Sequence, residues 1–187
     1  MTRSIRFTRL LLVGVLAAVA AWPLAQLAYA GPSAPDVPGR IAVQGAHKVF
    51  LVGHAVGVQI HSCNATASGY RWGFVAPRAD LFDDNGKLLM THFAGPKWRA
   101  KDGSEVKGTR VDGVTVDATA IPWLLLSATP TASGPDGDRL AETTFIQRIA
   151  TTGGLEPPAA DCNADTAGTI EEVPYTADYY FWKAIAA

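Results

Sequence analysis

Short runs of β-forming residues, separated by residues that favour turns, are the feature that most restricts how this chain can fold. Asn85-Gly86 lies between runs at 80–84 and 87–93, and type I′ hairpin turns prefer this dipeptide because both positions need positive φ. In that register Asp84 faces Lys87. Asp102-Gly103 predicts a second hairpin and Asp112-Gly113 a third. About nine or ten short strands with such turn chemistry are typical of a β-sandwich or a β-barrel.

We therefore expect an all-β fold, a single-domain β-sandwich with a barrel-like sheet as the alternative, with short hairpins and long Gly/Pro loops. Few windows have the periodicity of a helix, and there is no internal repeat. The expected strands are residues 48–52, 56–61, 70–75, 80–84, 87–93, 96–101, 104–107, 121–128, 143–152 and 177–183.

Residues 1–30 have the pattern of a cleaved secretory signal peptide. Three arginines precede an apolar run at residues 10–21, and Ala28-Tyr29-Ala30 ends in the small-x-small pattern that signal peptidase cuts. The alternative is a membrane anchor, because residues 10–30 are almost long enough to span a bilayer. Pro23 and the cleavage pattern favour removal, which predicts a periplasmic or secreted protein.

Removal of 30 of the 187 residues leaves 157, enough for one domain with a proper core. The prolines of residues 31–42 predict a flexible leader, followed by a single β domain at residues 43–187. The first 30 residues hold three of the sixteen basic residues and no acidic ones. The remainder therefore has 13 basic and 17 acidic residues, a net charge of −4, which gives no electrostatic footprint for nucleic acid. No apolar run after residue 30 is long enough for an integral membrane segment.

Cys63 and Cys162 are the only cysteines of the chain. An even number of cysteines in an exported protein indicates a disulfide, with two free buried thiols as the alternative. We expect the bond to join the end of one strand to a loop near the C-terminus.

Seven stretches of the sequence, taken together and in order, resemble a secreted bacterial and fungal family catalogued as domain of unknown function 3455. The resemblance extends from about residue 43 to residue 182, and His61 departs from it where relatives more often have an aromatic residue. It implies a secreted single domain, and it does not point to any particular activity. The stretches are residues 57–63, 74–81, 91–98, 102–104, 121–126, 146–154 and 179–181.

The histidines raise the question of a metal site, because His47, His54 and His61 are spaced seven residues apart. On a strand a step of seven places neighbours on opposite faces. His54 then shares a face with Val56, while His47 and His61 point the other way. Gln59 lies on the same face as His61. We expect no metal, and the sequence indicates no cofactor.

Five residues are candidates for ligand binding. His92 lies in a Gly/Pro-punctuated stretch close to Trp98, where packing or hydrogen bonding is the expected role. The indole of Trp98 is expected to pack in the core. If it is exposed beside another aromatic side chain, the two could form a platform on which a ligand stacks. An arginine inside an apolar strand pairs with a carboxylate, faces solvent or clamps a ligand. The candidates are His54, Gln59, His92, Trp98 and Arg148.

No catalytic motif of the common hydrolase, zincin, redox or nucleotide-binding kinds is present, and no catalytic residue is assigned. The sequence therefore predicts a binding or structural module of the cell envelope or extracellular space, whose partner is an envelope or extracellular ligand. The alternative is a nonstandard hydrolase of such a substrate, in which His92 and a nearby carboxylate act as the acid/base pair.

Overall fold

A computed structural model describes residues 31–185, and the expected signal peptide lies outside the described residues. Within the described part, eight β-strands and two short 3-10 helices follow one another along the chain. No helix in this part is long and apolar enough to cross a bilayer. The elements are η1 (Gly39–Ile41), β1 (His47–Thr66), β2 (Gly69–Phe82), β3 (Leu88–Phe93), β4 (Lys97–Ala100), β5 (Glu105–Val114), β6 (Trp123–Ala132), β7 (Phe145–Gly153), η2 (Ala159–Asp161) and β8 (Ile170–Ala184).

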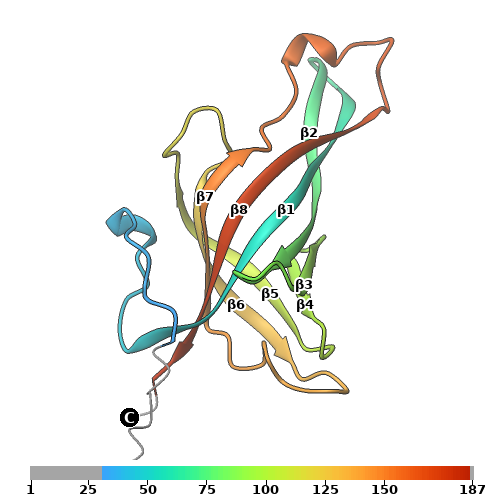
Figure 1. The fold of residues 1–187 in the computed structure, drawn as a ribbon. Helices are drawn as coiled ribbons and strands as arrows, with labels where there is room; N and C mark the ends of the chain where they lie inside the picture. Colours follow the sequence, from blue (N-terminus) through green and yellow to red (C-terminus); the bar gives the residue numbers. More distant parts are fainter. Residues whose placement is uncertain (1–30, 186–187) are drawn as a thin grey trace, which may run out of the picture. The chain divides into compact units, whose positions relative to one another are not determined.

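The strands form one antiparallel sheet that closes on itself (Figure 1). Each strand pairs with the next along the chain, and β8 returns to pair with β1 from His47 to Ser62. The all-β class is confirmed. Of the two expected architectures, the structure has the barrel-like one, because the strands make a continuous ring and not two packed sheets.

The first two strands are longer than the sequence predicts. Residues 48–52 and 56–61 belong to the single strand β1, which continues through Gly53 and Gly57 without a turn. Gly57 is required by packing, since a Cβ at this position would lie 2.2 Å from the carbonyl oxygen of Arg78. The glycine thus allows the close approach of β1 and β2 inside the ring.

The turns differ from expectation in two places. Asp83, not Asp84, pairs with Lys87, because the backbone N–H of Asp83 donates to the Lys87 carbonyl at 2.9 Å. The turn therefore has three residues, with Gly86 at φ 75°, and the predicted Asp84–Lys87 pair is wrong. The hairpin at Gly103 is confirmed. The prediction of a hairpin at Asp112-Gly113 is wrong, because these residues pair with β6 as part of β5.

One end of the barrel is filled by large apolar side chains. Phe181, Ile146 and Met90 are almost completely buried there. Leu140, in the loop between β6 and β7, is fully buried in the same cluster. The loop is held by Ser104, whose Oγ accepts a hydrogen bond from the Leu140 N–H at 3.1 Å. We call this part of the molecule the closed end.

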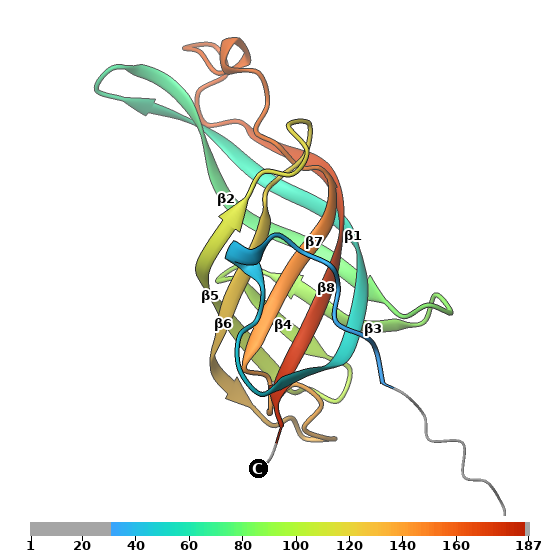
Figure 2. The same ribbon diagram turned by 90° about the vertical axis from the view of Figure 1, so that its left-hand side faces the viewer.

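The segment expected to be a flexible leader, residues 31–42, lies against the outside of the barrel (Figure 2). Ile41 is fully buried there with Leu125 and Ile149. Gln147 points outward from β7, and its Nε2 donates to the Ile41 carbonyl at 2.7 Å. A second, smaller apolar cluster therefore covers the outer face of β6 and β7.

β1 and β2 run on together past the other strands, and the loop of residues 154–169 lies beside them (Figures 1 and 2). The expected disulfide is confirmed, since Cys63 of β1 is bonded to Cys162 of this loop. The indole N–H of Trp72 also donates to the Pro158 carbonyl at 3.1 Å. In the chain-entropy account, a link between residues 99 positions apart stabilises the fold by about 4–5 kcal/mol.

Candidate functional site

The end of the barrel nearest this disulfide-linked loop contains two adjoining hollows. The first, of about 310 Å³, lies among β1, β2, β3, β4, β6 and β7. The second, of about 610 Å³, extends toward the loop at residues 154–156. The hollows share Gln59, Phe74, Leu124 and Arg148 in their walls. We therefore treat them as one space, the mouth cavity.

Four of the five candidate ligand-binding residues meet in the mouth cavity, although they come from four strands. Gln59 extends from β1, His92 from β3, Trp98 from β4 and Arg148 from β7. Their inward orientation follows from the two-residue alternation of each strand. Ring closure then brings together positions that lie up to 89 residues apart in the sequence.

Three aromatic side chains pack together beneath the cavity. His92 stacks on Trp98 with ring centroids 4.2 Å apart and planes 7° apart. Tyr179 of β8 meets both rings edge to face, at 5.3 and 5.4 Å. His92 is 3% exposed and Trp98 is 1% exposed. These side chains thus form a buried floor, of which Trp98 and Tyr179 also belong to the apolar core.

His92 is a neutral packing residue in this arrangement. Burial lowers its pKa to about 3, and the nearby Arg148 charge acts in the same direction. Its Nδ1 is 2.9 Å from the Lys97 carbonyl oxygen, which makes Nδ1 the protonated nitrogen of the neutral ring. No described carboxylate is hydrogen-bonded to His92, so the acid/base pair of the hydrolase alternative is not formed.

Arg148 brings a positive charge into the barrel. Its Nε and one Nη donate to the Pro122 carbonyl oxygen at 3.2 and 2.8 Å. These bonds leave the other guanidinium N–H groups for further acceptors, since arginine carries five donors. No carboxylate among residues 31–185 lies within 4.0 Å of its nitrogens. Of the roles expected for this arginine, carboxylate pairing is therefore wrong.

Several buried polar atoms in the cavity wall have no hydrogen-bond partner in the described protein. They are Nε2 of Gln59, Nε1 of Trp98 and both ring nitrogens of His61. All three side chains are at least 95% buried and line the mouth cavity. An unmade hydrogen bond of a buried group costs about 1–3 kcal/mol. This concentration of unsatisfied groups marks the cavity as a place where polar partners are expected.

The fifth candidate, His54, lies elsewhere. It shares a face of β1 with Val56, as the alternation predicts, and this face is the outer one. There it bridges Asp178 at 2.7 Å and Asp84 at 2.9 Å. Hydrogen bonds to these carboxylates raise the pKa of His54. The histidine ties the β2–β3 turn to β8 across the outer surface and does not line the mouth cavity. The described residues hold no cluster of three or more metal-ligating side chains.

Sequence reasoning missed several residues of the mouth cavity. His61 shares the inner face of β1 with Gln59, and the alternation already placed the two together. Phe74 and Leu124 line both hollows but look like ordinary core residues in the sequence. Gly154 borders the rim at φ 77°, where a Cβ would lie 2.9 Å from the Tyr175 side chain.

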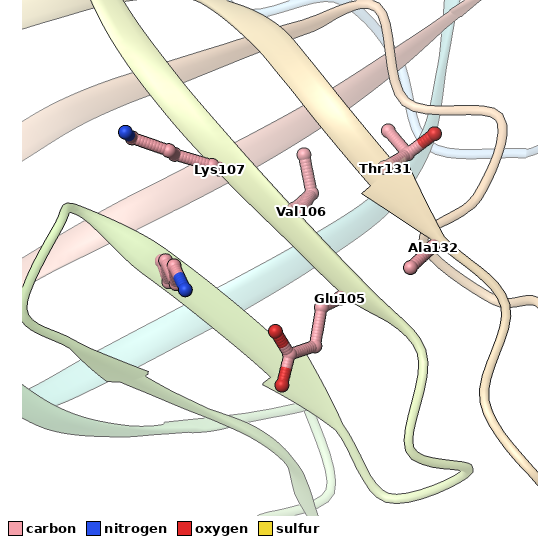
Figure 3. A pocket seen from close by; sticks show the side chains of 6 residues that line it. Glu105, Val106, Lys107, Thr131 and Ala132 are labelled. Atoms are coloured by element: carbon pink, nitrogen blue, oxygen red, sulfur yellow. The ribbon is translucent and has the colours of Figure 1, made fainter.

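A smaller hollow of about 290 Å³ lies beside β5 and the end of β6 (Figure 3). The side chains of Glu105 and Lys107 extend from β5 in different directions there (Figure 3). Glu105 is already engaged by an ion pair with Arg99. Because its polar groups do not converge on one point, this hollow is a weaker candidate than the mouth cavity.

A protein-family model described as a protein of unknown function (DUF3455) matches residues 44–183, which include all eight strands except Ala184, the last residue of β8. Searches of curated proteins and of solved structures found no match.

Proposed function

The chain belongs to the DUF3455 family of proteins of unknown function, and we propose that it is a binding protein that holds a small molecule in the mouth cavity of its barrel. The observation that carries this proposal is the set of unpartnered polar atoms on Gln59, His61 and Trp98. Native proteins leave few such atoms, and a ligand with polar groups would satisfy several at once.

The size and lining of the cavity support the same function. Its two hollows, about 310 and 610 Å³, fall in the range typical of small-molecule sites. Phe74, Leu124 and Leu126 supply apolar wall beside the polar atoms. An apolar cavity with a few convergent polar groups is the usual design of a ligand pocket.

Binding is favoured over hydrolysis by the state of His92. A general base must reach a transferable proton and titrate near the working pH. The buried His92 has a pKa of about 3 and hydrogen-bonds to a backbone carbonyl. His54 does contact carboxylates, but it lies on the outer surface, away from the mouth cavity.

We also propose that the protein acts outside the cytoplasm, in the periplasm or the extracellular space. The signal-like pattern of residues 1–30 and the Cys63–Cys162 disulfide support this location, since disulfides persist in oxidising compartments. N-terminal sequencing of the protein from fractionated cells tests it. A chain that starts at Gly31 outside the cytoplasm is expected, and an intact chain in the cytosol would refute the location.

The binding function can be tested with phenylnaphthylamine, a neutral apolar probe that fluoresces when it leaves water. We expect saturable binding by the wild-type protein. Leu124→Trp places a larger side chain in the wall of both hollows and should weaken binding about tenfold or more, through lost space and contacts. Val56→Trp is the matched control, because Val56 is 60% exposed on the outer surface of β1.

Thermal unfolding establishes that both variants are folded before the titrations are compared. Weaker binding in Leu124→Trp alone supports the mouth cavity as the site. Equal affinities in all three proteins, or no saturable binding by the wild type, would contradict the proposal.

A further inference from the structure

We propose that the ligand is an amphipathic organic anion, with its negative group at Arg148 and its apolar body between Phe74 and Trp98. This inference rests on the proposed binding function and specifies the chemical class of ligand. It is carried by the arrangement of donors and charge in the mouth cavity.

Arg148 differs from the arginines on the outside of the barrel. Arg40, Arg78 and Arg99 form ion pairs with Asp112, Glu172 and Glu105 on exposed surfaces. Arg148 faces inward and contacts both hollows. It donates to the Pro122 carbonyl, the Tyr179 hydroxyl lies beside it, and no carboxylate of residues 31–185 pairs with it. Partly buried cations are normally paired, so an anion at this position would complete the guanidinium's contacts.

The groups that face Arg148 do not supply a compensating negative charge. His92 is neutral, and burial raises the pKa values of Tyr175 and Tyr179, which keeps both phenols protonated. Two charged side chains lie in the wall of the larger hollow, Glu156 from the loop and Arg110 from β5. Both are exposed, so water screens them more strongly than it screens Arg148.

The unpartnered atoms also select for an acceptor. The Gln59 amide nitrogen, the Trp98 indole nitrogen and the guanidinium are all hydrogen-bond donors. A carboxylate, sulfonate or phosphate presents several acceptors to such groups and makes charge-assisted hydrogen bonds with arginine.

An inorganic anion would leave the apolar wall in contact with water. Phe74, Leu124 and Leu126 line the same space as Arg148 and Gln59. Burial of an apolar body against this wall contributes through the hydrophobic effect. The two kinds of surface together indicate an organic molecule with an anionic end.

A pair of fluorescent probes separates the charge from the apolar body. Anilinonaphthalene sulfonate carries the same ring system as phenylnaphthylamine and adds a permanently ionised sulfonate. The wild-type protein should bind the sulfonate about tenfold more tightly than the neutral probe, as one charge-assisted hydrogen bond implies. Arg148→Gln should lower sulfonate affinity about tenfold and change neutral-probe affinity less than about twofold.

Two further variants control for the role of Arg148. Arg148→Lys keeps the charge and should retain most of the preference for the sulfonate. Arg78→Gln removes an exposed arginine charge outside the mouth cavity and should change sulfonate affinity by less than about threefold, because exposed charges are screened. Thermal unfolding of each variant shows whether it is folded.

The outcomes separate this inference from the binding function on which it rests. If both probes bind equally well to the wild type, the cavity binds ligands but the anion preference is wrong. If Arg148→Gln weakens both probes to the same degree, Arg148 only shapes the cavity, which also overturns the inference. If neither probe binds, the binding function itself is refuted.

Discussion

The two ends of the barrel are built by the same strands but have different interiors. At the closed end, Phe181 and Ile146 are fully buried and Leu140 joins them from a loop. At the mouth, Gln59 and His61 are equally inaccessible but carry polar atoms without partners. The closed end contributes favourable burial, while the mouth carries polar groups that cost stability. The comparison assigns stability to one end and ligand binding to the other.

A matched pair of phenylalanine truncations should show the largest difference between the ends. Phe181→Ala removes a fully buried ring and should lower the free energy of unfolding by about 3–5 kcal/mol. Phe74→Ala removes a ring that is 59% exposed and should cost about 1 kcal/mol or less, while it weakens probe binding. Urea denaturation measures both. Equal losses of stability would mean that the mouth contributes to stability as much as the closed end does.

Acid should destabilise the protein through His92. Its pKa is about 3 in the folded state, against 6.5 for the unperturbed side chain, so the unfolded chain binds more protons below pH 6.5. Stability is therefore full above pH 6.5 and is lost as pH falls toward 3, by up to about 4 kcal/mol. In urea titrations from pH 7 to 4, His92→Phe should show a flatter acid dependence than the wild type. The same slope in both proteins would rule out His92 as the cause.

Gln59→Leu should separate stability from binding at the mouth. The substitution replaces a buried amide whose nitrogen has no partner with an apolar side chain of similar size. We expect stability to be unchanged or to rise by about 1 kcal/mol, because an unsatisfied polar group is removed. Affinity for anilinonaphthalene sulfonate should fall. A large loss of stability would instead show that the amide has a structural role.

The smallest effect is expected on the outer surface, at His54. Its raised pKa means that the folded state holds the proton more tightly than the unfolded state. The stabilisation is present at low pH and is lost as pH rises through that pKa, opposite in sign to His92. Because His54 is 41% exposed, solvent screening limits the effect to about 0.5 kcal/mol. The melting temperatures of wild type and His54→Asn should differ at pH 5.5 and converge at pH 8.5. The same difference at both pH values would contradict a stabilising role for protonated His54.

The sequence contains the local features of this fold but not its closure. Turn dipeptides and β-forming runs located most of the strands, and the two cysteines located the disulfide. Pairing of β8 with β1 joins residues more than a hundred positions apart, and no local pattern reports such a contact. The hairpin expected at Asp112-Gly113 does not form, because pairing with β6 outweighs the turn preference of these residues.

The candidate site was predicted in part for the same reason. Alternation along β1 correctly separated Val56 from Gln59, but the apolar face turned out to be the outer one, with Val56 60% exposed. A narrow ring accommodates glycine, alanine and polar groups near a cavity, so hydrophobicity alone does not identify the inner face. His54 was selected by residue type, and its carboxylate partners on β8 and the β2–β3 turn became visible only in the folded chain.

The central claim is that the unpartnered donors of the mouth receive a ligand. Nitrogen–proton correlation spectra during titration with anilinonaphthalene sulfonate test it directly, because the indole N–H groups report individually. The Trp98 indole and the Gln59 side-chain amide should shift as the probe binds. The Trp182 indole, which already donates to Gln147 at 2.9 Å, should stay in place. Binding of the probe without any shift at Trp98 or Gln59 would contradict the account.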